Sequence, residues 1–513
     1  MKTSYIFFLM TLLFVATSCE DWFSNPPESE MVKEDFWKKK GDVESAIGAC
    51  YRGLTEQGVI ERLIVWGEVR SDNVIDGKSF DDNINKILTA NITATNGYTR
   101  WDQFYSCINN CNTLIANASG VLNEDPDFSE AELNQYLAEA KAIRAFCYFT
   151  LVKTFRDVPF TTEPYEDDSK DFFLPQTDGD EILRTLLNDL KSVESQAPVM
   201  WNDNVPYTKG RITRKAIWAL EADIALWLNQ YEECVAACDK VLTTTANPIS
   251  LERSSAYFNN VFFRGNSDES IWELQFDQNV QNGAVQSMYG LNTDYRLSSY
   301  DFTTYGSSTD LFSQAHDLRR MNALVESGAY FAIKKYIALR TNTTNVKARE
   351  SDFMNGEPIS NWIIYRLPDI YLMKAEALAE LGGDTNLQQA VELCSRTFDR
   401  ANPDMEEGSL IGQYSSQNDV RNLVLTERQR EFLYEGKRYF DLMRLMRRNG
   451  NPEQVLETYL RKKYESIVDN WSLIKPKLND PDAIYMPVND DELRANPYLQ
   501  QNRFYQTSSD ITR

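Results

Sequence analysis

Apolar residues recur at helical spacing along much of this chain. Side chains three and four residues apart form one stripe in most of these segments, which is the pattern of a helix that packs one face on a core. The segment after Ala142 is apolar nearly all round, which indicates a helix buried on most sides. Helices are predicted at residues 36–53, 101–118, 133–155, 180–195, 213–228, 231–242, 368–381, 386–402 and 426–447. The pattern therefore predicts a mainly α fold.

Two of these helices form the clearest local motif. Alanines recur every third residue from Ala216 to Ala225, and such an edge lets helices pack closely. A turn at Asn229-Gln230 leads directly into the second helix, Tyr231 to Leu242. The two segments together resemble a tetratricopeptide helix pair, although the pairs along this chain do not follow a fixed period.

Long irregular insertions separate the predicted pairs, and the largest covers about residues 244–360. Its Ser270 to Phe276 stretch reads as a short strand, and residues 281–310 read as a polar loop rich in Ser, Thr, Asn, Asp and Gly. Because insertions of this length in a helical scaffold are usually functional, we expect this one to form part of a binding surface.

The N-terminal residues are typical of an export signal. Lys2 precedes a mostly apolar run from Tyr5 to Val15, which is too short to span a bilayer. The run ends in Ala16-Thr17-Ser18-Cys19, which resembles the lipobox of bacterial lipoproteins. Residues 1–18 are therefore interpreted as a signal peptide and Cys19 as the lipidated first residue. The alternative is an ordinary signal peptide with a chance cysteine nearby.

Residues 19–30 read as a short tether with an acidic pair, Glu20-Asp21, and two prolines. The acidic pair resembles the surface-export signal of Bacteroidetes lipoproteins. Several acyl chains on Cys19 would anchor the protein stably to a membrane.

Composition excludes several functions. With 42% apolar residues the chain has enough material for a large core, and its net charge of −23 argues against a nucleic-acid partner and against docking on anionic lipid. Seven cysteines remain besides Cys19, including the pairs Cys107/Cys111 and Cys234/Cys238. The chain has one histidine and no Cys-x-x-Cys pair, so we expect buried thiols and no metal site.

Several motifs in order along the chain resemble the SusD/RagB family of nutrient-binding lipoproteins. They are FWKKKGDVESA at 36–46, EAKAIRAFCYF at 139–149, RDVPF at 156–160, RLPDIYLMKAEA at 366–377, ERQREF at 427–432, EGKRYFDL at 435–442, YMPV at 485–488, and NP at 496–497 with QN at 501–502.

The resemblance implies a tetratricopeptide-like scaffold of helical pairs with long loop insertions and a few short strands, formed as one domain by residues 31–513. It also implies an outward-facing position on the outer membrane, above a SusC-type TonB-dependent transporter. The protein would pass an oligosaccharide to that transporter, or a peptide as in some relatives. No cofactor and no catalytic residue come with the family.

Two segments are candidates for ligand binding, because tyrosine rings can stack on sugar C–H faces while their hydroxyls bind sugar hydroxyls. The first contains Tyr289, Tyr295, Tyr300, Phe302 and Tyr305. The second contains Asp72 and Asn73, followed by a loop that leads to Tyr98 and Trp101. The alternative is that these side chains only hold their own loops, and Trp101 is expected to begin a packed helix.

The charged segment 427–441 could suggest catalysis. Glu431 and Glu435 are four residues apart, and paired carboxylates hydrolyse glycosides. Arginines three residues from several of the acids favour an ion-pair ladder along the helix instead. Glu376 is expected to be a buried carboxylate paired with Arg366 or another base, and His316 to be ordinary surface. An enzyme such as a secreted glycoside hydrolase, and a pure protein adaptor, remain alternative hypotheses.

Overall fold

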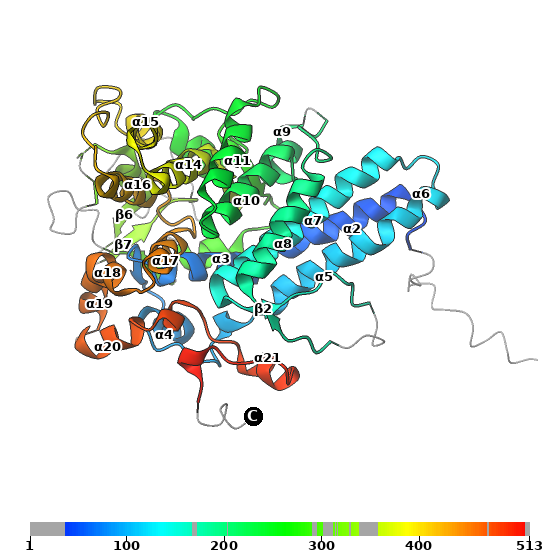
Figure 1. The fold of residues 1–513 in the computed structure, drawn as a ribbon, viewed down its shortest axis with the longest axis horizontal. Coiled ribbons are helices and arrows are strands. Elements are labelled where there is room, and N and C mark those ends of the chain that lie inside the picture. Colours follow the sequence, from blue (N-terminus) through cyan, green and yellow to red (C-terminus); the bar gives the residue numbers. More distant parts are fainter. Residues whose placement is uncertain are drawn as a thin grey trace, which may run out of the picture.

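Helices dominate the computed structural model, as the apolar pattern predicted (Figure 1). The structure describes residues 36–166, 172–202, 204–289, 295–300, 311–312, 314, 316–327, 330–337, 358–468 and 471–507. The longer helices are α2 (Lys40–Leu54), α3 (Gln57–Ile64), α5 (Asp102–Asn117), α7 (Glu130–Phe155), α8 (Gly179–Val193), α10 (Arg214–Trp227), α11 (Tyr231–Thr243), α14 (Leu367–Leu381), α15 (Asp384–Ala401), α16 (Gln417–Glu431), α17 (Arg438–Asn449) and α20 (Trp471–Leu478).

Short elements connect these helices. The short α-helices are α4 (Asp82–Leu88), α6 (Val121–Glu124), α9 (Val205–Gly210), α12 (Gly283–Tyr289), α13 (Leu318–Ala323), α18 (Glu453–Val455), α19 (Arg461–Ile467) and α21 (Asp490–Ala495). The π-helices are η2 (Val65–Val69), η5 (Asn259–Arg264) and η7 (Leu456–Leu460), and the 3-10 helices are η3 (Gly97–Thr99), η4 (Ala118–Gly120), η8 (Pro481–Ile484) and η9 (Arg503–Tyr505).

Consecutive helices pack against each other as pairs. Helix α5 packs on both α2 and α7, α10 packs on α11, and α14 packs on α15 (Figure 1). The predicted pair at 213–242 is confirmed: the alanine edge of α10 is buried, and Asn229 makes the turn with a positive φ of 59°. Helix α11 also packs on α14, which joins one pair to the next.

The prediction of one long helix at 426–447 is wrong. Helix α16 ends at Glu431, and α17 begins only at Arg438. Between them Tyr434 and Gly436 have φ angles of 62° and 71°, in the left-handed region that an α-helix does not contain. This turn packs on η2, where a Cβ built on Gly67 would lie 1.8 Å from the carbonyl oxygen of Gly436. Tertiary packing on η2 therefore accompanies the break.

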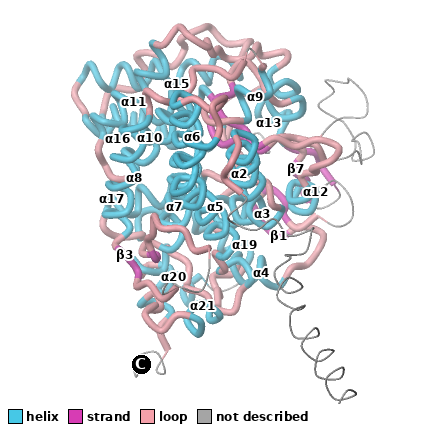
Figure 2. The backbone as a smooth tube through the Cα atoms, turned by 90° about the vertical axis from the view of Figure 1, so that its right-hand side faces the viewer, coloured by secondary structure: helices cyan, strands magenta, loops and turns pink. Residues whose placement is uncertain are grey.

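Strands form three small antiparallel sheets, seen in magenta among the helices in Figure 2. One sheet has the order β1-β5-β7-β6, from β1 (Val74–Asp76), β5 (Leu297–Ser299), β7 (Tyr330–Ile333) and β6 (Leu324–Ser327). The others pair β4 (Ser270–Leu274) with β8 (Trp362–Arg366), and β2 (Val158–Pro159) with β3 (Gln176–Thr177).

Within the large insertion, the predicted strand at 270–276 is confirmed as β4, which is buried throughout. The prediction of a polar loop at 281–310 is wrong in part, because α12 and β5 lie inside it. Strand β5 forms by pairing with β1 and β7, which are remote in sequence and leave no local pattern.

One large apolar cluster runs from Val43 to Val488, and a smaller one lies between α14, α15 and α16. All seven cysteines within the described residues are buried free thiols, as expected. No group of acidic, histidine or cysteine side chains in that part of the chain could hold a metal ion. Of the helices that the structure describes, none combines the length and the apolar character that a membrane span requires.

Candidate functional site

The structure brings together the two segments predicted to bind ligand. Strand β1 follows Asn73 and pairs antiparallel with β5, so Val74 lies opposite Ser299 and Asp76 opposite Leu297. The loop after β1 continues this contact, since the Gly77 amide donates to the carbonyl of Arg296 at 2.9 Å. A Cβ on Gly77 would lie 2.3 Å from the carbonyl oxygen of Tyr295, so this approach requires glycine.

Polar and aromatic side chains from several elements meet beside this junction. The Tyr98 hydroxyl accepts from Arg296 at 3.3 Å and donates weakly to Glu61 at 3.5 Å. The Arg296 guanidinium also lies 3.6 Å from Glu61 and 3.7 Å from Asp81. Burial, together with the negative charges of Glu61 and Asp81, raises the pKa of Tyr98, so its hydroxyl stays protonated.

Phe80 is the exposed aromatic of this region, with 75% of its surface open to solvent. It lies between Lys78, whose ammonium is 5.4 Å from the ring centre of Tyr295, and Asp81, which caps α4. We call the surface formed by Glu61, Lys78, Phe80, Asp81, Tyr98 and Arg296 the Phe80 face. It combines an exposed apolar ring with charged groups, which suits a hydroxyl-rich ligand, and the Tyr98 hydroxyl holds these groups from beneath, since Tyr98 itself is buried.

Sequence reasoning identified part of this face and missed the rest. Tyr98 was a candidate, whereas Phe80 and Arg296 were not singled out. Phe80 did carry a signal, because it is a lone aromatic in the polar run Asp76 to Asp82. Arg296 carried none, since its partners Glu61 and Asp81 are remote in sequence.

Asp72 and Asn73 have internal partners that account for them without a ligand. Both Asp72 carboxylate oxygens accept from Arg438, at 2.8 and 2.9 Å. The Asn73 amide donates to Glu68 at 3.0 Å and accepts from Gln429 at 3.0 Å. These bonds join η2 to α16 and α17, and a ligand contact at Asp72 or Asn73 stays a prediction.

The predicted tyrosines of the segment 289–305 differ in burial. Tyr289 is fully buried and donates to the Tyr434 carbonyl at 3.2 Å, and Tyr295 is 1% exposed. Both rings are buried, and a ligand contact at either stays a prediction. Tyr300 is half-buried, and its amide donates to the Asn73 carbonyl at 2.9 Å. Tyr305, Phe302 and Cys19 lie outside the described residues.

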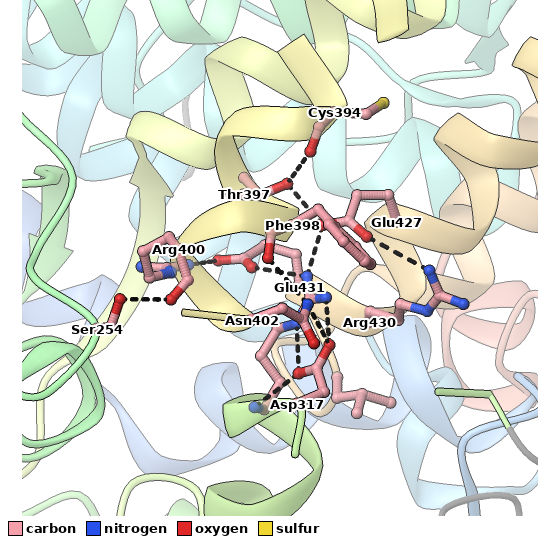
Figure 3. Close-up of polar contacts among 12 residues, drawn as sticks. Ser254, Asp317, Cys394, Thr397, Phe398, Arg400, Asn402, Glu427, Arg430 and Glu431 are labelled. Atoms are coloured by element: carbon pink, nitrogen blue, oxygen red, sulfur yellow. Dashed lines mark hydrogen bonds and ion pairs between the residues drawn. The ribbon is translucent and has the colours of Figure 1, made fainter. Parts of the chain in front are cut away.

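The charged segment forms a buried network with other elements instead of the predicted ion-pair ladder along the helix (Figure 3). Of the four pairings expected along the helix, the described residues contain one, Arg430 with Glu427 at 3.7 Å. Glu431 instead binds arginines from three other elements, with Arg366 at 2.6 Å, Arg319 at 3.3 Å, and Arg400. The other predicted pairs do not form, because these acids face the interior and bind residues of other elements.

Glu435 belongs to the same network. Its carboxylate lies 2.7 Å from both Arg366 and Lys335, and Arg366 also reaches Glu269 at 3.1 Å. The Glu431 and Glu435 side chains are completely buried and ion-paired, so neither is placed to act on a glycosidic bond. The network is a structural joint between β8, α15, α16 and the insertion.

Two other expectations are resolved. Glu376 is buried and paired with another base, as predicted, but that base is not Arg366: Arg444 and Arg448 each lie 2.7 Å away. His316 is exposed, with its imidazole 3.5 Å from Asp404, which agrees with ordinary surface.

Helical pairs joined by irregular insertions define a tetratricopeptide-like scaffold, and comparisons with known proteins identify its family. A model described as "SusD family" matches residues 326–505, and one described as "Starch-binding associating with outer membrane" matches residues 21–226. The chain belongs to the SusD/RagB family.

Relatives match over most of the chain. SusD-like protein P38 of Formosa agariphila is 27% identical over 478 residues, which cover 86% of this chain and 91% of the relative. A solved SusD superfamily protein from Bacteroides vulgatus has a TM-score of 0.71 at 20% identity, covering 91% of this chain and all of that one. A solved laminarin-binding SusD-like protein has a TM-score of 0.67 at 19% identity, covering 91% and 99%. These structures confirm the fold.

Proposed function

We propose that this protein is a surface lipoprotein that captures a neutral oligosaccharide and passes it to a SusC-type TonB-dependent transporter, without catalysis. The observation that carries the proposal is the Phe80 face, an exposed aromatic ring beside charged groups on a SusD-family scaffold. The family descriptions add support, because one matching model is named for starch binding at the outer membrane and one structural neighbour for laminarin binding.

The proposal also assigns the parts of the chain. Residues 31–513 form one domain, which the large apolar cluster supports because it contains residues from before, within and after the insertion at 244–360. Residues 1–18 are the signal peptide, and residues 19–30 are the tether that holds this domain above the outer membrane, facing outward, with its lipid on Cys19.

Glycan binding is tested by isothermal titration of the full mature protein with oligosaccharides from laminarin, starch and xylan, and with short peptides. We expect binding of at least one glycan, and Phe80→Ser should weaken it by about two- to tenfold, because an aromatic contact contributes roughly 0.5–1.5 kcal/mol. Tyr207→Ser is the matched control, since Tyr207 is also an exposed aromatic, at 56%, but lies on α9. Binding of peptides alone, or of nothing, would contradict the proposal.

The anchor is tested separately. Cys19→Ala removes the thiol to which lipid is attached, so nearly all of the protein should move from the outer-membrane fraction to the soluble fractions of a Bacteroides host. Immunoblots of separated membrane and soluble fractions measure this change. Ser24→Ala, a few residues further along the tether, is the control and should stay with the membrane. If the Cys19 variant also remains with the membrane, the lipid assignment is wrong.

A further inference from the structure

A second aromatic groove lies away from the Phe80 face. It is a cavity of about 510 Å³ between the start of α5, the segment around β2 and β3, and α21. That volume is within the range of small-molecule sites, about 300–1,000 Å³. Its lining shares no residue with the Phe80 face, although Trp101 in its wall follows Tyr98 by three positions. We call it the Phe172 groove.

The groove presents large aromatic side chains to solvent. Phe172 and Phe173 are 50% and 45% exposed, and the Phe172 ring stacks on Tyr165 with ring centres 4.9 Å apart. Trp101 and Tyr105 continue the aromatic wall on α5. Adjacent exposed phenylalanines are unusual on a soluble surface, and such an apolar patch usually marks a binding site.

Hydrogen bonds hold the wall in place. Asn109 on α5 donates to the Tyr165 carbonyl at 2.9 Å and accepts from the Tyr165 amide at 2.8 Å. The Tyr105 hydroxyl donates to the Pro159 carbonyl at 2.6 Å, and Asn496 donates to the Leu174 carbonyl at 2.8 Å. The aromatic segment is thereby tied to α5 and to the C-terminal region, so the groove is largely formed before any ligand binds.

The polar groups of the wall indicate what the groove would hold. Glu492 and Asp102 both line it. Burial raises the pKa of Glu492, the neighbouring Trp101 lowers it in part, and a carboxylate can accept several hydrogen bonds. An apolar protein segment laid over Glu492 would bury that carboxylate without enough hydrogen-bond donors, which is unfavourable. Sugar hydroxyls would supply those donors, while an acidic sugar would be repelled.

We propose that the Phe172 groove is a second glycan-binding site, which takes a short neutral oligosaccharide. Its sugar C–H faces lie against the rings of Phe172 and Phe173, and its hydroxyls donate to Glu492 and Asp102. The inference rests on the proposed function for its ligand class, but not on the Phe80 face. Two sites on one protein would retain a polysaccharide better than either alone, because the second contact becomes intramolecular.

The test uses Phe172→Ser/Phe173→Ser, which changes exposed side chains, with Tyr207→Ser as the control. For a short oligosaccharide that binds the wild type, titration should give two sites per protein, and one site in either the Phe172/Phe173 double variant or Phe80→Ser. In affinity gels containing laminarin or starch, the double variant should bind about tenfold more weakly than the wild type, and the control should match the wild type.

Other outcomes separate the two proposals. One site in the wild type, lost in Phe80→Ser and kept in the double variant, would overturn the second site and leave the proposed function standing. A double variant that binds glycan as the wild type does, but loses binding of an apolar fluorescent dye, would overturn it in favour of an apolar partner. A wild type that binds no glycan would overturn both.

Discussion

Arg366→Met should destabilise the protein by about 3–5 kcal/mol, the cost of removing one partner from a buried ion pair. Arg366 is completely buried and reaches three carboxylates, those of Glu269, Glu431 and Glu435. Methionine fills similar space but leaves these acids short of positive charge in the interior. Urea unfolding followed by circular dichroism measures the loss of free energy.

Two further variants show whether the loss of stability comes from the buried arginine and its planar side chain. Arg366→Lys keeps a charge but loses the planar fork that binds two carboxylates at once, so we expect an intermediate loss. Arg461→Met removes an exposed arginine from its pairs with Glu457 and Glu465, and should cost less than about 1 kcal/mol. A loss for Arg366→Met as small as that of Arg461→Met would show that the network does not stabilise the fold.

The helices were predictable because their information is local. Repeated apolar spacing placed α5, α7, α10 and α11 within a few residues of their ends. The break between α16 and α17 also had a local signal that the prediction missed. Gly436 lies inside the segment predicted as one helix, and glycine commonly ends a helix. The alternation of acids and arginines through 427–441 hid that signal by favouring a continuous charged helix.

The charged network was not predictable, because spacing in sequence shows which residues share a helix face and not what that face meets. The partners of Glu431 include Arg319 and Arg366, which come from the insertion and from β8. An arginine three residues away explained the same acid equally well before the fold was known.

Only part of the candidate site could be predicted, because the sequence does not show which segments meet in the fold. Aromatic content pointed to the segment 289–305, and the structure pairs its β5 strand with β1, beside the predicted loop. Packing determines which aromatic side chains are exposed. Tyr289 is buried in the core, whereas Phe80, Phe172 and Phe173 are exposed to solvent. The identity of the exposed rings therefore required the fold.

The stabilisation of the folded state by Glu435 should decrease as the pH falls from about 5 to about 2. Burial by itself would raise the pKa of this carboxyl, but the charges of Arg366 and Lys335 outweigh that effect and lower the pKa from 4.5 to about 2. A carboxylate with a lowered pKa in the folded state stabilises the fold above its unfolded value, near 4.5. That stabilisation is lost as the pH falls towards 2.

The variant Glu435→Gln isolates this effect, because it is uncharged at every pH. We expect it to be less stable than the wild type at pH 6 by about 3 kcal/mol, which corresponds to the lowering of the pKa from 4.5 to about 2 and includes the lost hydrogen bonds to Arg366. The difference should narrow by roughly 3 kcal/mol between pH 5 and pH 2, as the wild-type carboxylate gains its proton. Urea midpoints for both proteins across this range measure the difference.

Glu465→Gln, at an exposed pair with Arg461, is the control and should differ from the wild type by less than about 1 kcal/mol. A Glu435→Gln difference that stays constant or widens as the pH falls would mean that Glu435 is not held ionised by Arg366 and Lys335.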